Sequence, residues 1–106
     1  MQEKYLPMSE VYLAEETGNV CGFIALVENK IAAIFVSPKH QRKGIGKRLI
    51  SFAKKIKTQL ELNVYQDNKN SVKFYELNDF KILKETVDDE IKAKEFVMFW
   101  KKLVRE

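Results

Sequence analysis

"SPKHQRKGIGKRLI", residues 37–50, decides the fold, because it joins a stretch typical of a strand to one typical of a helix. It carries six basic side chains, one of them a histidine, and two glycines in fourteen positions. Before it, "IAAIFV" is apolar and rich in strand formers, and after it apolar residues recur at helical spacing from Ile45 to Ile56. The segment is therefore a nucleic-acid patch, a solvated helix start or a loop that holds a phosphate.

The composition is typical of one folded globular domain, which we expect to span residues 1–106, with 45% hydrophobic and 32% charged residues. Its single cysteine, Cys21, excludes an intramolecular disulfide and favours a reducing compartment. The opening "MQEKYLPMSE" lacks the apolar core of a secretion signal, and "IAAIFV" is too short to cross a bilayer. We therefore expect a cytoplasmic protein without a membrane partner.

Strand and helix patterns alternate along the chain. The predicted strands are residues 9–16, 20–28, 31–38, 60–65, 80–87 and 95–103. The predicted helices are residues 43–56 and a segment within 67–80, capped by Asn68, Asn70 or Ser71 and with Val72, Phe74, Tyr75 and Leu77 as apolar positions.

This order predicts an α/β (α+β) fold with a mixed twisted sheet. An antiparallel amino-terminal meander is followed by a central parallel pair of strands within a β-α-β-α-β unit. Such a crossover is right-handed, and ligands bind at the carboxyl ends of the parallel strands.

The position of residues 37–50 between a strand and a helix favours phosphate binding. A glycine-containing loop that opens a helix presents backbone amides at the positive end of the helix dipole. Gly44 and Gly46 remove side chains that would hold an oxygen away, and Arg42, Lys43 and Lys47 add positive charge. A merely solvated helix start would instead favour acidic residues. We therefore expect a pyrophosphate site.

Two other anion-binding classes fit less well. The first class is the nucleotide-binding loop, but neither of its two common motifs, G-x-x-x-x-G-K-[ST] and G-x-G-x-x-G, occurs in the sequence. A nucleic-acid module would interleave aromatic residues with the basic ones, and residues 37–50 contain no aromatic residue other than His40. We therefore expect no nucleic-acid partner, although the net charge of +4 permits one.

The arrangement Gln41-x-x-Gly44-x-Gly46 resembles the acetyl-CoA loop of the GCN5-related N-acetyltransferase (GNAT) superfamily, [Q/R]-x-x-G-x-[G/A]. A second stretch, "LNVYQDNKNSVKFYELNDF" (62–80), resembles the following strand and helix of that family. The two matches cover about residues 30–82, and their wording is similar to that of bacterial members.

The resemblance implies a transferase that moves an acetyl group from acetyl-CoA to a primary amine by direct attack, without a metal. The acceptor is a small-molecule amine or a protein amine. It also implies that Tyr75 is the general acid for the departing thiolate and that Asn68 contacts the cofactor. The remaining cofactor-binding residues it implies are Ile34, Phe35 and Val36 for pantetheine, and Gln41, Arg42, Lys43, Gly44, Ile45, Gly46 and Lys47 for pyrophosphate.

Structural roles compete with these assignments. Tyr75 also fits a core aromatic, and Asn68 also fits a helix cap. His40 fits a solvated surface residue and Cys21 a small apolar core residue. Because Cys21 lies in an early strand, a covalent cysteine route is disfavoured.

The sequence departs from the family at three places. Many members carry a glutamate as general base five residues before the asparagine, where this chain has Asn63; Glu61 is a substitute, or merely a solvent-facing carboxylate. "NDF" replaces the usual "LGF", and Asn78 and Asp79 tolerate left-handed geometry.

The third departure concerns the amino terminus. Only about eight residues precede the first predicted strand, where the family has a further strand and helices. We therefore expect a sheet edge and apolar surface that a homodimer, a partner or an open acceptor site would accommodate. The alternative function is a CoA-binding remnant with a regulatory role and little or no turnover.

Overall fold

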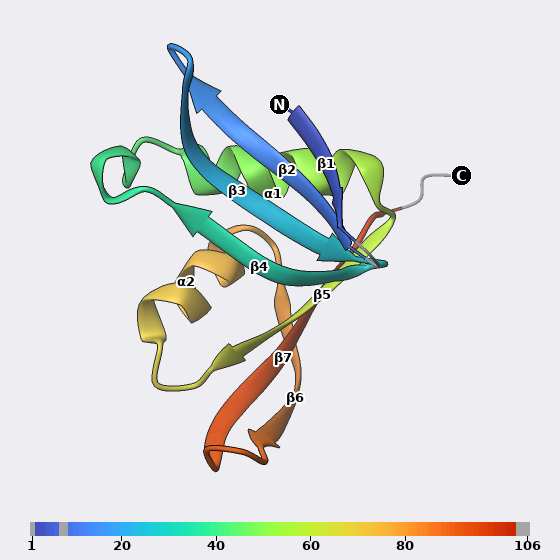
Figure 1. The fold of residues 1–106 in the computed structure, drawn as a ribbon. Coiled ribbons are helices and arrows are strands. Elements are labelled where there is room, and N and C mark those ends of the chain that lie inside the picture. Colours follow the sequence, from blue (N-terminus) through green and yellow to red (C-terminus); the bar gives the residue numbers. More distant parts are fainter. Residues whose placement is uncertain (1, 7–8, 104–106) are drawn as a thin grey trace. The chain divides into compact units, whose positions relative to one another are not determined.

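The computed structural model describes residues 2–6 and 9–103, which form two compact units (Figure 1). The first unit ends at Thr58 and the second begins at Gln59. The first contains β1 (Gln2–Leu6), β2 (Ser9–Glu16), β3 (Asn19–Val27), β4 (Lys30–Val36), the 3₁₀ turn η1 (Pro38–His40) and α1 (Ile45–Ile56). The second contains β5 (Gln59–Tyr65), α2 (Lys69–Leu77), β6 (Lys81–Asp88) and β7 (Ala93–Lys101).

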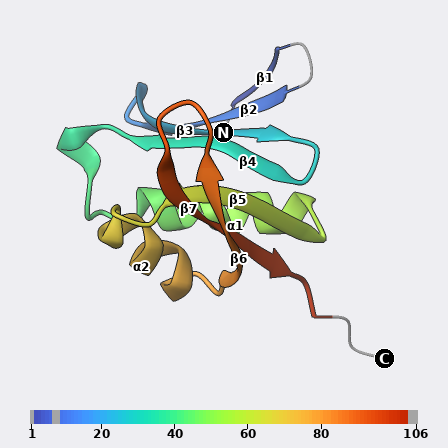
Figure 2. The same cartoon turned by 90° about the horizontal axis from the view of Figure 1, so that it is seen from below.

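The first unit is an antiparallel meander with one helix on it. Strands β1 to β4 pair in chain order. Figures 1 and 2 show α1 across one face of the meander. The core there consists of alternate strand residues and one stripe of the helix: Tyr12, Ala14, Ile24, Leu26, Ile45, Leu49, Ile50 and Ala53.

Gly22 allows α1 and β4 to approach β3 closely. A Cβ atom at this position would lie 2.6 Å from the Phe35 carbonyl oxygen and 3.4 Å from Cγ2 of Ile45. Because the first contact is with backbone, a side chain would force the strand to shift. The close packing of the start of α1 and the end of β4, which flank the basic loop, therefore depends on the absence of a side chain at Gly22.

A polar clasp fixes the other end of α1. The Lys57 ammonium lies 3.3 Å from Glu10 Oε1, and the Tyr12 hydroxyl donates to Glu10 Oε2 at 2.5 Å. The Tyr12 ring packs on Phe52 with centroids 4.8 Å apart. The hydrogen bond from Tyr12, assisted by Lys57, lowers the pKa of Glu10 below its ordinary value.

The second unit is a three-stranded antiparallel sheet with α2. β7 lies between β5 and β6. Leu60, Leu62 and Val64 of β5 are buried on one face, whereas Glu61 and the other alternate residues lie on the opposite face. α2 begins at the cap Asn68, whose Oδ1 accepts the Ser71 amide at 3.2 Å.

The expected order of strands and helices is confirmed, with β1 as an added strand. One prediction about burial, that of Leu77, is wrong. β1 was not predicted, because its five residues carry no strand-like alternation of apolar residues. It pairs with β2, so the β2 edge that we expected to be exposed is covered. Leu77 was expected among the apolar positions of the second helix, but it is 75% exposed. Asp79 takes the left-handed turn (φ 70°), as its residue type allowed.

No helix in the described part of the chain is long and apolar enough to cross a membrane.

Candidate active site

The loop between β4 and α1 has the geometry of an anion-binding nest. Arg42 (φ 65°) and Gly44 (φ 80°) both adopt left-handed backbone on either side of Lys43. Such alternation turns successive amides toward a common concavity that suits a phosphate. The sequence analysis predicted neither left-handed residue, and the arginine costs roughly 1 kcal/mol in this conformation.

The first turn of α1 adds free amides to this nest. The first intrahelical bond runs from the Arg48 amide to the Gly44 carbonyl at 3.0 Å. The amides of Ile45, Gly46 and Lys47 precede it and have no intrahelical acceptor. The first turn of α1 contains no acidic residue, so the positive end of the helix dipole is not offset there.

Hydrogen bonds to β3 and β4 hold the loop in place. The Ser37 amide donates to the Cys21 carbonyl at 2.8 Å, and the Gln41 side chain donates to the Val36 carbonyl at 3.2 Å. His40 Nε2 lies 3.7 Å from Glu16 Oε2, and the His40 side chain is only 20% exposed. The expectation of a solvated His40 is therefore wrong, because the turn of η1 folds it against β2.

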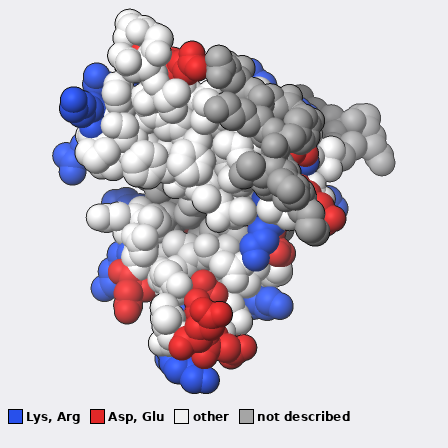
Figure 3. Space-filling model, viewed as in Figure 1, with Lys and Arg blue, Asp and Glu red and all other residues white. Residues whose placement is uncertain are grey.

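The loop's positive charge remains on the surface. Gln41, Arg42, Lys43 and Lys47 are exposed, whereas Ile45 is buried as the first core residue of α1. Figure 3 shows basic side chains gathered at this edge of the first unit. The loop can therefore offer directed amides and mobile cations to one polyanionic ligand.

The end of β4, predicted to hold pantetheine, lies directly before this loop. Phe35 is 50% exposed and stacks on Phe23 with centroids 5.9 Å apart. Ile34 and Val36 are half-buried on the other side of the strand. All the predicted cofactor-binding residues except Asn68 thus fall in one continuous segment of the first unit.

Tyr75 lies in the second unit, on the buried side of α2. Its side chain is 8% exposed and makes edge contacts with Phe74 and Phe80 at centroid distances of 5.3 and 5.7 Å. Burial raises the pKa of the Tyr75 hydroxyl above its usual value. The phenol is therefore neutral and protonated at pH 7, as a proton donor must be.

A family model described as an acetyltransferase (GNAT) domain matches residues 7–82. The chain belongs to the GNAT acetyltransferase family. The resemblance inferred from the loop and from the second helix is thereby confirmed.

Curated relatives of this GNAT chain are bacterial. It is 34% identical over 101 residues to the peptidyl-lysine N-acetyltransferase YiaC of Escherichia coli, covering 94% of this chain and 69% of that protein. It is 31% identical over 87 residues to the peptidyl-lysine N-acetyltransferase YjaB of Salmonella typhimurium, covering 80% of this chain and 60% of that protein. The chain thus spans roughly 60 to 69% of the length of these relatives.

Solved acetyltransferase structures confirm the fold class. A Bacillus anthracis protein assigned as a streptothricin acetyltransferase, solved with acetyl coenzyme A, matches with a TM-score of 0.80 and 25% identity over 91% of this chain and 64% of that one. A Bacillus subtilis acetyltransferase in complex with CoA matches with a TM-score of 0.75 and 20% identity over 93% of this chain and 80% of that one.

Asn63, which occupies the position of the usual GNAT base, contacts Glu95, a residue that was not predicted. Asn63 of β5 donates from Nδ2 to Glu95 Oε1 of β7 at 3.3 Å. Glu95 was missed because it lies 32 residues further along the chain, and only strand pairing brings it to Asn63. Glu61, the predicted substitute base, lies on the same face of β5 and is exposed.

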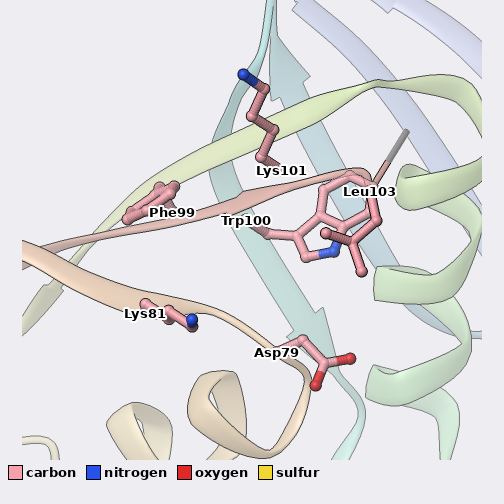
Figure 4. Close-up of a pocket in the computed structure, with 6 residues that line it drawn as sticks. All are labelled: Asp79, Lys81, Phe99, Trp100, Lys101 and Leu103. Atoms are coloured by element: carbon pink, nitrogen blue, oxygen red, sulfur yellow. The ribbon is translucent and has the colours of Figure 1, made fainter. Parts of the chain in front are cut away.

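A hollow of about 550 Å³ opens at the end of β7 (Figure 4). Its lining residues are Asp79, Lys81, Phe99, Trp100, Lys101 and Leu103. None of the predicted site residues lines it. Among the described residues, no group of three or more histidine, cysteine, aspartate or glutamate side chains is arranged to hold a metal ion.

Proposed function

We propose that this protein transfers the acetyl group of acetyl-CoA to the side-chain amine of lysine residues in proteins. The observation that carries the donor is the nest of Arg42–Lys47, whose backbone geometry suits a phosphate or pyrophosphate in an acetyltransferase domain. Lysine as the acceptor is supported by the two relatives, both peptidyl-lysine N-acetyltransferases.

The first unit would bind the donor. The amides of residues 42–47 would hold the pyrophosphate oxygens, with Lys43 and Lys47 adding charge. The main chain of Ile34, Phe35 and Val36 would pair with pantetheine, and an amide near the end of β4 would polarise the thioester carbonyl. Gln41 would act indirectly, because its side chain anchors the loop to the Val36 carbonyl.

The second unit would supply the acid. Tyr75 would give its hydroxyl proton to the sulfur as the C–S bond breaks, and would recover a proton from solvent after CoA leaves. Asn68 would serve as both helix cap and cofactor contact, since capping uses only its Oδ1.

We also propose that the protein is a homodimer. Support comes from the β2–β4 face opposite α1, where register aligns Leu13, Phe23 and Phe35 in one row and Val11, Ala25 and Ala33 in the next. In Figure 3 the part of this face that grey atoms do not cover shows no charged side chains. Light scattering at several protein concentrations tests the proposal; a monomer throughout would contradict it.

Titration with acetyl-CoA tests the proposed function. Thermal stability should rise with ligand, by about 2.7 kcal/mol at a hundredfold excess over Kd. The same samples, given a lysine peptide or a polyamine, should acetylate the peptide more efficiently. Stabilisation without transfer to any amine would favour a CoA-binding remnant, and no stabilisation would contradict the assignment of the loop.

A further inference from the structure

The face of the second unit that carries Asn63 presents a carboxylate with a hydrogen bond to one of its oxygens. Asn63 lies opposite Val97 and Tyr65 lies opposite Glu95, so Asn63 and Glu95 are diagonal neighbours on one face. The Asn63 amide donates to Oε1 of the half-buried Glu95 at 3.3 Å. This bond engages one oxygen of the carboxylate, Oε1, and links its position to that of Asn63.

The groups around Glu95 are mostly neutral or negative. On β5, the Tyr65 hydroxyl donates to Asp88 Oδ2 at 3.1 Å. On β6, Thr86 lies opposite Glu95, and Lys84 and Asp88 are its diagonal neighbours. The hydrogen bond to Asp88, with the negative charges of Asp88, Glu95 and Glu90, raises the pKa of Tyr65. An incoming cationic amine would meet a negative potential here.

The other carboxylates on the strands β5, β6 and β7 are less suited to accept a proton from an amine. Asp88 is engaged by the Tyr65 hydroxyl, and Glu85 accepts from the Gln66 side chain on the opposite face of the sheet. Glu61 is exposed, and exposure leaves a side chain of its length without a fixed direction. Asn63 itself has no basic atom.

We propose that Glu95, oriented by Asn63, is the proton acceptor for the attacking amine, an inference that rests on the proposed function. At pH 7 a lysine amine is almost entirely protonated, so one proton must leave before attack. Glu95 takes that proton, directly or through one water, and passes it to solvent.

The remaining protons then balance. The free electron pair of nitrogen attacks the thioester carbon, forming the C–N bond, and the C–S bond breaks as the carbonyl re-forms. The nitrogen loses its second proton to solvent through Glu95, while Tyr75 protonates the departing thiolate and is reprotonated from solvent. The products are an acetylated lysine, CoA thiol and one proton.

The test compares Glu95→Gln with wild type on two acceptors. With a lysine peptide, kcat/KM for the acceptor should fall by about 100-fold, the usual contribution of a general base. With an aminooxy peptide, whose amine is already uncharged at pH 7, most of that loss should disappear. A structural defect would lower both rates equally, and equal loss would therefore overturn the proposal.

Matched variants separate this proposal from its neighbours. Glu85→Gln makes the same chemical change on the opposite face of the sheet and should leave both rates unchanged. Asn63→Ala should lower the lysine rate less than Glu95→Gln, with partial rescue by the aminooxy peptide. If Glu61→Gln, and not Glu95→Gln, shows the acceptor-dependent loss, Glu61 is the base and the proposal is wrong. If wild type acetylates neither peptide, the proposed function fails and not merely the assignment of Glu95.

Discussion

The two units of this protein differ in charge and in how their functional residues are put together. Residues 1–58 carry ten Lys and Arg against five Asp and Glu, whereas residues 59–106 carry nine against ten. In the first unit the predicted donor site is one continuous segment, Ile34–Lys47. In the second unit the proposed acid, the proposed base and the residue proposed to orient it come from α2, β7 and β5.

Under the proposed function, this difference gives the two units separate tasks. A polyanionic donor needs many amides and cations at one point, which a single loop at a helix start can supply. An amine acceptor needs one carboxylate in a fixed position, which strand pairing supplies. Substitutions in the first unit should therefore change donor affinity, and substitutions in the second unit should change turnover.

The largest effect is expected at Gly44, in the first unit. Gly44→Glu adds a negative charge where the pyrophosphate would bind and forces a side chain into left-handed backbone at φ 80°. Acetyl-CoA affinity should fall on the order of 100-fold or more, a loss of about 2.7 kcal/mol, measured by calorimetric titration.

Gly44→Ala is the matched control for that change. Space around the position is open, with no atom within 4 Å of a built Cβ, so only the backbone strain remains. Its affinity should fall much less than that of Gly44→Glu. Equal acetyl-CoA affinities for wild type, Gly44→Glu and Gly44→Ala would contradict the assignment of the loop to the donor site.

Tyr75→Phe, in the second unit, should change turnover without changing donor affinity. It keeps the contacts with Phe74 and Phe80 but removes the hydroxyl that is the proposed proton donor. Turnover should fall by about 100-fold while acetyl-CoA affinity stays within a factor of two or so. Parallel loss of affinity and turnover would make Tyr75 a packing residue.

Gly22→Ala should act on stability before it acts on function. The added Cβ would lie 2.6 Å from the Phe35 carbonyl oxygen, so β3 and β4 must separate. We expect a loss of about 1–3 kcal/mol in the free energy of unfolding, measured by urea denaturation. Unchanged stability would contradict the close approach of β3 to β4.

The smallest effect is expected from the clasp of Glu10 and Lys57. Because the folded-state pKa of Glu10 is lowered, its contribution is present above the ordinary value of 4.5 and is lost as the pH falls through the folded-state value. Lys57→Met should remove up to about 1 kcal/mol at pH 7 and less at acid pH. Thermal unfolding at both pH values measures this; a loss that grows toward acid pH would contradict the sign.

The contrast between contiguous residues and residues brought together by folding also explains which features could be predicted from the sequence. The loop and α1 could be predicted because glycines, basic residues and helical spacing are contiguous there. β1 could not, because its pairing with β2 gives five residues a strand geometry that their own pattern does not indicate. Nor could the pairing of His40 with Glu16 or of Asn63 with Glu95, since each depends on contacts made only after folding.

The proposed reaction is direct acetyl transfer from acetyl-CoA to a lysine amine. The decisive measurement follows carbon-13-labelled acetyl-CoA and a lysine peptide with the wild-type protein, quantifying CoA thiol and labelled acetyl-lysine in the same samples. We predict that both products form in equal amounts and that both form more slowly with Tyr75→Phe. Release of CoA thiol without labelled peptide, or no reaction with bound acetyl-CoA, would contradict it.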